Sequence, residues 1–149
     1  MAEYIFEDAT IPTLTGRNCY ANEVELIFNT DEESLWNTQV EGVVQYCIDE
    51  NTTELDLSQS DLEGPIPAEI GQLTNLTHLD FRRNFGLGPF PPEIGNLVNL
   101  VYLNIYQTQM RDEDLPPEFA NLINLREFNS RLNYFRYFPY QLENLQNLE

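Results

Sequence analysis

The side chains that could do chemistry in this 149-residue sequence do not form a complete catalytic set. His78 is the only histidine, and Asp56 and Asp80 stand at matching places of a repeated pattern. A histidine needs a nucleophile and an orienting acid beside it, and no serine or cysteine is placed to serve His78. The sequence has no zinc-type spacing, no glycine-rich phosphate loop and no H-E-x-x-H motif. We therefore expect no catalytic residue, no metal ion and no cofactor, and interpret the protein as not an enzyme.

Two carboxylate groups could still hold a cation. Asp56 and Asp80 are expected side by side, where they could share a proton or a metal ion. Arg82 and Arg83 follow closely and would compensate their charge, which favours a structural role. The run 112–114, Asp-Glu-Asp, lacks the glycine and the alternating spacing of a calcium loop, so we interpret it as a solvated bulge.

The charge of the chain is lopsided, with a net value of −18. Residues 1–76 hold sixteen carboxylates and one arginine, whereas residues 77–149 hold nine carboxylates and six arginines, and lysine is absent. Such acidity argues against binding to nucleic acid or to an anionic membrane surface. No apolar run reaches the roughly 18 residues of a membrane-spanning helix. The first twenty residues also lack the basic start and apolar stretch of a signal peptide.

One pattern of about 24 residues recurs four times and must position these side chains. Its marker is the tetrad Leu-x-Asn-Leu, which begins at Leu73, Leu97, Leu122 and Leu145. The predicted copies are 53–76, 77–100, 101–125 and 126–148. A repeat this short cannot bury its own apolar side, so the copies must stack into a solenoid.

Each copy has two halves. The first alternates apolar and polar residues, as in Leu55-Asp-Leu57, which predicts a strand with one buried face. Strands that recur at a fixed interval must pair in parallel. The second half is proline-rich and predicts a turn that enters a short helical segment. A further inward column is predicted from Ile66, Phe90, Leu115 and Phe138.

The repeat resembles the plant-specific class of leucine-rich repeat, and 77–100 follows that pattern closely. Thr77-His-Leu-Asp-Phe-Arg-Arg-Asn84 leads through Gly88-Pro-Phe-Pro91 to Leu100. The resemblance implies a right-handed α/β solenoid with a parallel sheet on its concave face and short 3₁₀ or helical turns on the convex side. It also implies a likeness to receptor-kinase ectodomains and to polygalacturonase inhibitors. The pattern departs from the class at Ser60 and Thr108, where a buried Asn is expected.

Residues 1–52 resemble, loosely, the N-terminal cap of this family, with Trp36 and the stretch before Cys47 as markers. Such a cap covers the open end of the first coil. We expect a short amphipathic helix at 22–28. Cys19 and Cys47 are the only cysteines and could be buried thiols or one disulfide; the need to seal the solenoid end favours the disulfide. No matching C-terminal cap is visible, so the last coil is predicted to be open.

The predicted concave face carries the candidate binding site. Arginine and tyrosine are the residue types that anchor protein interfaces, and they gather on this face although arginine is scarce in the chain. The candidate contact residues are His78, Arg82, Arg83, Tyr102, Tyr106 and Arg131.

Two other features are less specific. The aromatic run 134–140 could plug an irregular last coil or contact a partner, with Phe135 and Phe138 expected inward. Asn51 and Asn75 begin glycosylation sequons, which matter only in a protein secreted by a eukaryote.

These observations favour a recognition module that binds a protein or peptide ligand on its concave face. The alternatives are an inhibitor of a secreted polysaccharide-degrading enzyme and a structural fragment that associates with itself through its open C-terminal coil. We expect an extracellular or cell-surface location.

Overall fold

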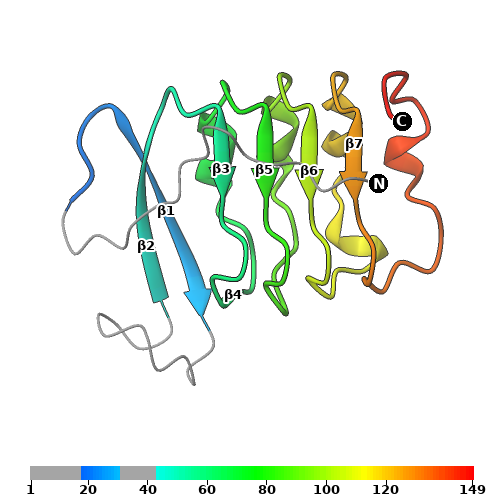
Figure 1. Ribbon diagram of the computed structural model, residues 1–149, viewed down its shortest axis with the longest axis horizontal. Coiled ribbons are helices and arrows are strands. Elements are labelled where there is room, and N and C mark those ends of the chain that lie inside the picture. Colours follow the sequence, from blue (N-terminus) through cyan, green and yellow to red (C-terminus); the bar gives the residue numbers. More distant parts are fainter. Residues whose placement is uncertain (1–17, 31–42) are drawn as a thin grey trace.

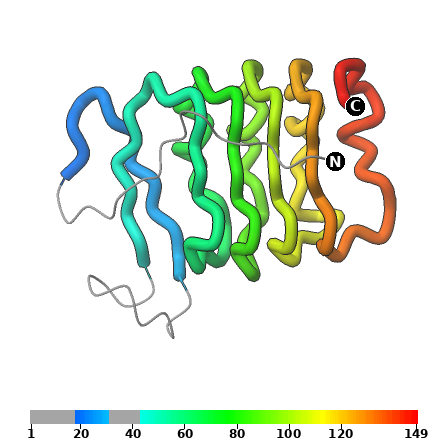
Figure 2. The backbone as a smooth tube through the Cα atoms, in the orientation of Figure 1, coloured from blue at the N-terminus to red at the C-terminus, as the bar shows by residue number. Residues whose placement is uncertain are grey.

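The computed structural model describes residues 18–30 and 43–149, which form an elongated stack of coils beside a β-hairpin (Figure 1). One short parallel strand comes from each coil, and the sheet has the order β3-β5-β6-β7. These strands are β3 (Glu54–Asp56), β5 (His78–Asp80), β6 (Tyr102–Asn104) and β7 (Glu127–Asn129). Successive coils run side by side along the long axis (Figure 2).

The register of the sheet follows the sequence repeat. Leu55 lies opposite Leu79, Leu79 opposite Leu103, and Leu103 opposite Phe128. The first three of these strand-centre residues are fully buried, and Phe128 is partly buried against the same core. The predicted parallel sheet is therefore confirmed, because only this pairing buries the apolar member of every strand.

The opposite side of each coil is built from 3₁₀ turns. They are η1 (Ala68–Gln72), η2 (Pro92–Asn96), η3 (Asp112–Asp114), η4 (Pro117–Asn121) and η5 (Tyr140–Leu142). An extended proline precedes four of them, at Pro67, Pro91, Pro116 and Pro139. Throughout the described ranges every helical segment is 3₁₀, and none is long and apolar enough to cross a membrane.

Glycine allows the coils to approach each other closely on the turn side. A Cβ added to Gly71 would lie 2.6 Å from the carbonyl oxygen of Glu93, and one on Gly95 would lie 2.8 Å from that of Glu118. Real Cβ atoms do not pack this closely against backbone. The spacing of the first three coils therefore depends on glycine, which has no side chain, at these two positions.

Phenylalanine side chains link the interiors of neighbouring coils. Rings of Phe81 and Phe90 have centroids 6.2 Å apart, Phe90 and Phe119 are 5.7 Å apart, and Phe119 and Phe128 are 5.4 Å apart. Phe28 of the hairpin contacts Phe81 at 6.2 Å, edge to face. The hairpin and the coils thus share one continuous apolar core.

Two asparagines, the buried Asn84 and the partly buried Asn133, satisfy the backbone where the chain leaves the sheet. Oδ1 of Asn84 accepts from the amides of Ser60 and Leu62, and its Nδ2 donates to the carbonyls of Leu57 and Phe81. Asn133 makes the equivalent bonds between the third and fourth coils. It accepts from two amides and donates to two carbonyls. Each asparagine therefore bonds its own coil to the preceding one.

The smaller residues at the same place make fewer hydrogen bonds than the asparagines. The hydroxyls of Ser60 and Thr108 donate within their own coils, to the carbonyls of Ser58 and Ile105. The hydroxyl of Thr108 also donates to Oδ1 of Asn133 in the next coil, at 3.0 Å.

The N-terminal region contains a strand where a helix was expected. Residues 22–28 belong to β1 (Glu23–Thr30), which pairs antiparallel with β2 (Val43–Asp49) and with β4 (Leu62–Glu63). The helix prediction was wrong because Val24, Leu26 and Phe28 alternate inward against the first coil, a period of two that a helix cannot provide.

A disulfide joins Cys19 to Cys47 and fastens the segment before β1 to β2. It confirms the favoured alternative for these two cysteines. Trp36 lies outside the described residues. The assignment of the whole range 1–52 as a cap stays a prediction.

In the last coil, one of two side chains predicted to point inward does not. Phe138 is 67% exposed, so its predicted inward orientation was wrong. Gln141 instead turns into the core, where its side-chain amide donates to the carbonyl of Leu115. Phe135 packs partly against the core as predicted.

Candidate functional site

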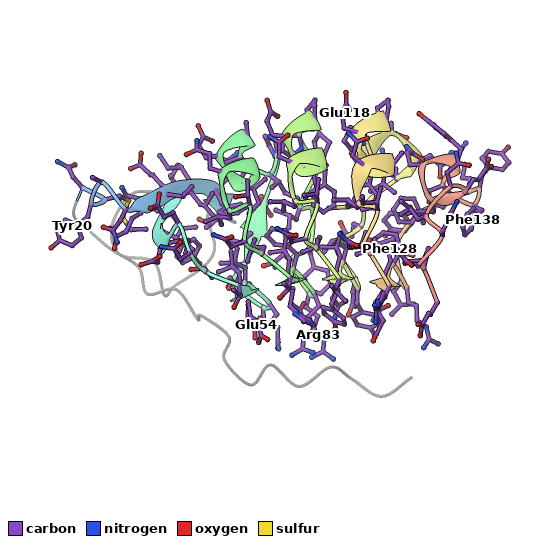
Figure 3. The ribbon with its side chains drawn as sticks, turned by 90° about the horizontal axis from the view of Figure 1, so that it is seen from above. Tyr20, Glu54, Arg83, Glu118, Phe128 and Phe138 are labelled. Atoms are coloured by element: carbon purple, nitrogen blue, oxygen red, sulfur yellow. A yellow bond between two sulfur atoms is a disulfide. The ribbon has the colours of Figure 1, made fainter. Side chains whose placement is uncertain are left out.

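The strand face consists of the outward side chains of β3, β5, β6 and β7 and of the residues that follow each strand. Figure 3 shows Glu54 and Arg83 on this face and Glu118 on the opposite, turn-bearing face. The register places the outward side chains in rows that run across the coils. One row holds Glu54, His78, Tyr102 and Glu127, and the next holds Asp56, Asp80, Asn104 and Asn129.

The second row ends the strands. Oδ1 of Asp56, Asp80 and Asn104 accepts from the amide two residues further on, at 2.8–2.9 Å. Asn129 makes the same bond to the amide of Arg131 at 3.3 Å. These local turns fix the direction in which the following residue leaves the sheet. Asp56 and Asp80 thus have a structural role, because each carboxylate fixes the turn that follows its strand.

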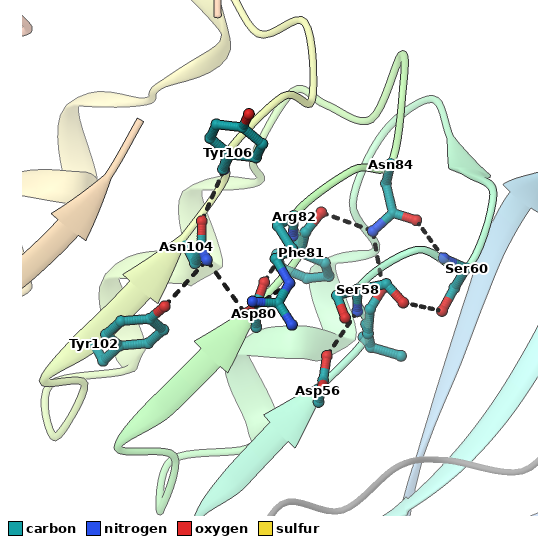
Figure 4. A network of polar contacts seen from close by, with 11 residues as sticks. Asp56, Ser58, Ser60, Asp80, Phe81, Arg82, Asn84, Tyr102, Asn104 and Tyr106 are labelled. Carbon is teal, nitrogen blue, oxygen red and sulfur yellow. Dashed lines mark hydrogen bonds and ion pairs between the residues drawn. The ribbon is translucent and has the colours of Figure 1, made fainter. Parts of the chain in front are cut away.

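Asp80 also stands at the centre of a buried polar network (Figure 4). Its Oδ2 accepts from Nδ2 of Asn104 at 3.3 Å and lies 3.8 Å from Nε of Arg82. Burial raises the pKa of Asp80 to about 6, and the neighbouring Asp56 adds to the rise, while Arg82 and Asn104 oppose it. The carboxylate is therefore held on the outward side of the sheet without contact to solvent.

Tyr102 is part of this network and not a free contact residue. The prediction that it faces solvent was wrong: only 6% of it is exposed. Its hydroxyl accepts from Nδ2 of Asn104 at 3.0 Å, and the ring stacks on His78. Burial, with the nearby Asp80 carboxylate, raises the pKa of Tyr102 to about 12. The tyrosine therefore supports the face from beneath.

His78 covers Tyr102 from the neighbouring strand. The two ring centroids are 5.8 Å apart with an interplanar angle of 28°. Nδ1 lies 2.9 Å from the hydroxyl of Thr77 and 3.9 Å from a carboxylate oxygen of Glu54. Burial lowers the pKa of His78, against the opposing effect of Glu54 and Glu127. Burial beside Tyr102 thus favours the neutral form of the imidazole.

The remaining candidates lie one step beyond the strands and reach solvent. Arg83 and Arg131 are exposed, Tyr106 is half-buried, and the side chain of Arg82 is 27% exposed. Arg82 pairs with Asp80, whereas neither Arg83 nor Arg131 forms an ion pair with another described residue. Arg83 has a left-handed backbone, φ 57°, as do residues at the same place in the other coils. The three arginines and Tyr106 form the accessible part of the candidate site.

Sequence reasoning missed the role of Asn104. It treated this residue only as an outward position, although its amide links Asp80 to Tyr102. A signal existed in the sequence, because Asp or Asn occupies the same place in all four copies.

Two further groups of possible metal ligands can be judged from the structure. Within the described ranges, Cys19, Glu23 and Cys47 are the one group of three ligand residues close enough for a metal ion, and the disulfide removes both thiolates. In the 112–114 run, Asp112 accepts from the amide of Arg136 and Asp114 from that of Arg111. The run is therefore a hydrogen-bonded bulge.

The sequon asparagines lie at the surface. Asn51 and Asn75 are exposed, and Nδ2 of Asn75 makes a long bond of 3.4 Å to the carbonyl of Glu50. Their modification remains a prediction.

The stacked coils, with a parallel sheet on one face and 3₁₀ turns on the other, define a repeat solenoid. Residues 51–73 and 75–97 match the family model for the Leucine Rich Repeat. The chain is therefore a leucine-rich-repeat solenoid, and its repeats are of the plant type, as the sequence resemblance implied.

Solved structures agree with this assignment. The plant peptide hormone receptor RGFR1, solved in complex with RGF2, is 32% identical with a TM-score of 0.59, over 68% of this chain and 16% of the receptor chain. A TDR receptor is 30% identical with a TM-score of 0.57, over 68% of this chain and 18% of that one.

The leucine-rich-repeat ectodomain of the receptor kinase SOBIR1 from Arabidopsis thaliana has the same fold. It is 24% identical with a TM-score of 0.58, over 76% of this chain and 59% of the ectodomain. The present chain thus spans less than two thirds of each of these proteins. No curated protein sequence matches it.

Proposed function

We propose that this chain is a non-enzymatic recognition module that binds a protein or peptide ligand on its strand face. The observation that carries the proposal is the cluster of accessible Arg82, Arg83, Tyr106 and Arg131 on one rigid surface of a protein whose net charge is −18. Arginine and tyrosine provide planar donors and large contact area at low cost in side-chain entropy. Two similar structures are receptors, one of them solved with its peptide hormone.

The rigidity of this surface supports tight binding. Arg82 is held by the Asp80 carboxylate, and the amides of Arg82, Tyr106 and Arg131 are each held by the side chain two residues before. A surface that is already ordered loses less conformational entropy when a ligand binds. We infer that residues 1–52 act as the cap that keeps the first coil in place.

The Cys19–Cys47 disulfide supports a location outside the reducing cytosol. The exposed Asn51 and Asn75 sequons are consistent with such a location. An extracellular or cell-surface position is therefore part of the proposal.

The proposal can be tested with peptides selected from a random display library on the wild-type protein. Substitution of Arg82, Tyr106 and Arg131 together by alanine should weaken a selected peptide severalfold or more. The matched control replaces Arg17, Tyr20 and Arg126 by alanine, which removes the same residue types at positions outside the proposed contact set. Equal affinity of the wild type and the first triple variant would refute the site.

Self-association is a second candidate, favoured by exposed aromatic side chains in the last coil. Tyr137 is 78% exposed, Phe138 67% and Tyr140 61%. Such a patch on a soluble domain often marks a contact surface. Light scattering over a concentration series should then show mass that rises with concentration and falls in a Tyr137→Ser/Phe138→Ser variant. A constant monomer mass would exclude this function.

A further inference from the structure

A solvent-open pocket of about 850 Å³ lies between the third and fourth coils, away from the strand face. Arg111, Asp112 and Glu113 line it from the third coil, and Tyr134, Phe135 and Arg136 line it from the fourth. Figure 1 shows the two segments next to each other, as the yellow turn η3 and the orange chain that follows β7. Its volume is in the range of ligand-binding pockets.

The third coil differs from the first two at the place of the pocket. In the first two coils, Gly64 and Gly88 stack closely, with the amide of Gly64 bonded to Gly86 and that of Gly88 bonded to Gly64. The third copy carries η3 at the matching place, in a repeat one residue longer than the one before. The side chains of η3 and of 134–136 form the walls of the pocket. The first two coils have glycine at the matching place and so no side chains there.

The walls are fixed by hydrogen bonds across the two coils. The amide of Arg136 donates to Oδ1 of Asp112 at 3.1 Å, and the amide of Tyr134 donates to the carbonyl of Met110 at 2.8 Å. Within the third coil, Oδ2 of Asp114 accepts from the amide of Arg111 at 2.7 Å. Two of the three carboxylates of the bulge are therefore engaged with backbone, and Glu113 stays at the exposed rim.

The groups left free in the pocket are mainly hydrogen-bond donors. The guanidinium groups of Arg111 and Arg136 are exposed and form no ion pair with another described residue. The side-chain amide of Gln109 and the hydroxyl of Tyr134 add further donors. Arginine matches carboxylate oxygens in pairs, and the two aromatic rings provide flat walls for apolar contact.

We propose that this pocket is a second binding site, which takes a carboxylate-rich segment of a protein partner. Two guanidinium groups from different coils would each bind one carboxylate of an extended acidic peptide, while Tyr134 and Phe135 contact its backbone. The site is separate from the strand face, so the chain could hold two ligands or two parts of one ligand at once. Six of the seven arginines of the chain lie in residues 77–149, and two of them line this pocket.

The test uses acetylated and amidated tetraglutamate as the probe, with tetraserine as the uncharged comparison. Calorimetric titration of the full chain at low salt should show binding of tetraglutamate and none of tetraserine. The Arg111→Ala/Arg136→Ala variant should lose binding roughly tenfold, since two charge-assisted contacts disappear. Both side chains are exposed, so circular dichroism should show an unchanged fold.

The matched control is Arg17→Ala/Arg126→Ala, which removes the same charge at positions outside both proposed sites and should leave tetraglutamate affinity within about twofold. An equal loss in both variants would show a general effect of net charge and overturn the proposal. No binding of tetraglutamate to the wild type, or equal binding of tetraserine, would overturn it as well.

Discussion

The guanidinium Nε of Arg82 lies 3.8 Å from Oδ2 of Asp80, a carboxylate that has no solvent-exposed surface. The same aspartate also accepts the backbone amide of Arg82 through Oδ1 at 2.8 Å. A buried anion therefore holds both the backbone and the side chain of a residue on the proposed binding surface. Changes at Asp80 should affect stability and the position of Arg82 together.

The pKa of Asp80 leads to a prediction about stability and pH. A folded-state pKa of about 6 exceeds the ordinary value of 3.8, so the folded protein binds more protons between these two values. Stability from this group is thus highest in acid and falls as pH rises from about 4 to about 6. Asp80→Asn keeps the acceptor oxygen but cannot ionise. Its stability relative to wild type should rise by about 2–3 kcal/mol over this window.

Denaturant unfolding at pH 4, 5, 6 and 7 measures this difference. Asp56→Asn is the control for the substitution itself, because Asp56 occupies the same place one coil earlier and is only half-buried. If the curves for wild type and Asp80→Asn ran parallel, Asp80 would not titrate in this range.

The bonds of Asn84 predict a large loss of stability on truncation. Asn84→Ala leaves two buried amides and two carbonyls without their partner, which should cost about 2–4 kcal/mol. Asn75→Ala removes only one long, exposed bond and should cost less than about 0.5 kcal/mol. Urea unfolding of both variants provides the comparison, and similar losses would contradict the role given to Asn84.

The close contact at Gly71 predicts that even one methyl group is not tolerated. The Cβ of Gly71→Ala would meet the carbonyl oxygen of Glu93 at 2.6 Å, so η1 and η2 would have to separate, at a cost of about 1–3 kcal/mol. The third coil has Ala120 at this place, so Ala120→Gly should cost at most about 1 kcal/mol. Thermal unfolding of the two variants compares these losses of stability. An unchanged midpoint for Gly71→Ala would show that the coils can shift freely.

Removal of the disulfide should loosen the hairpin before it loosens the coils. Cys19 and Cys47 are 28 residues apart in sequence, and Cys19→Ser/Cys47→Ser should lose roughly 3 kcal/mol of stability. Hydrogen exchange should quicken first in β1 and β2 and leave β5 and β6 protected. Uniform loss of protection along the chain would mean that hairpin and coils unfold as one unit.

The repeat made most of the fold predictable. Leu79, Leu103 and Phe128 recur at the same place of each copy, and stacking leaves a parallel register as the arrangement that buries them all. The accessible arginines followed from the same register, because an outward position in one strand is outward in the next.

The exceptions depend on contacts that no repeat encodes. The burial of Tyr102 requires the ring of His78 on one side and the amide of Asn104 beneath its hydroxyl. The strand at 23–30 depends on a partner strand that follows much later in sequence. Phe138 is exposed, whereas Gln141, three residues later, is buried and donates to the carbonyl of Leu115. Each outcome was decided by a specific neighbour and not by local pattern.

Chemical-shift mapping of a selected peptide on isotope-labelled protein tests the central claim most directly. The account predicts that the largest amide shifts fall on 82–83, 106 and 131, along one row of the strand face. Shifts centred on the turn side, around Glu69, Glu93 and Glu118, would contradict it, because the peptide would then bind the face that carries no arginine cluster.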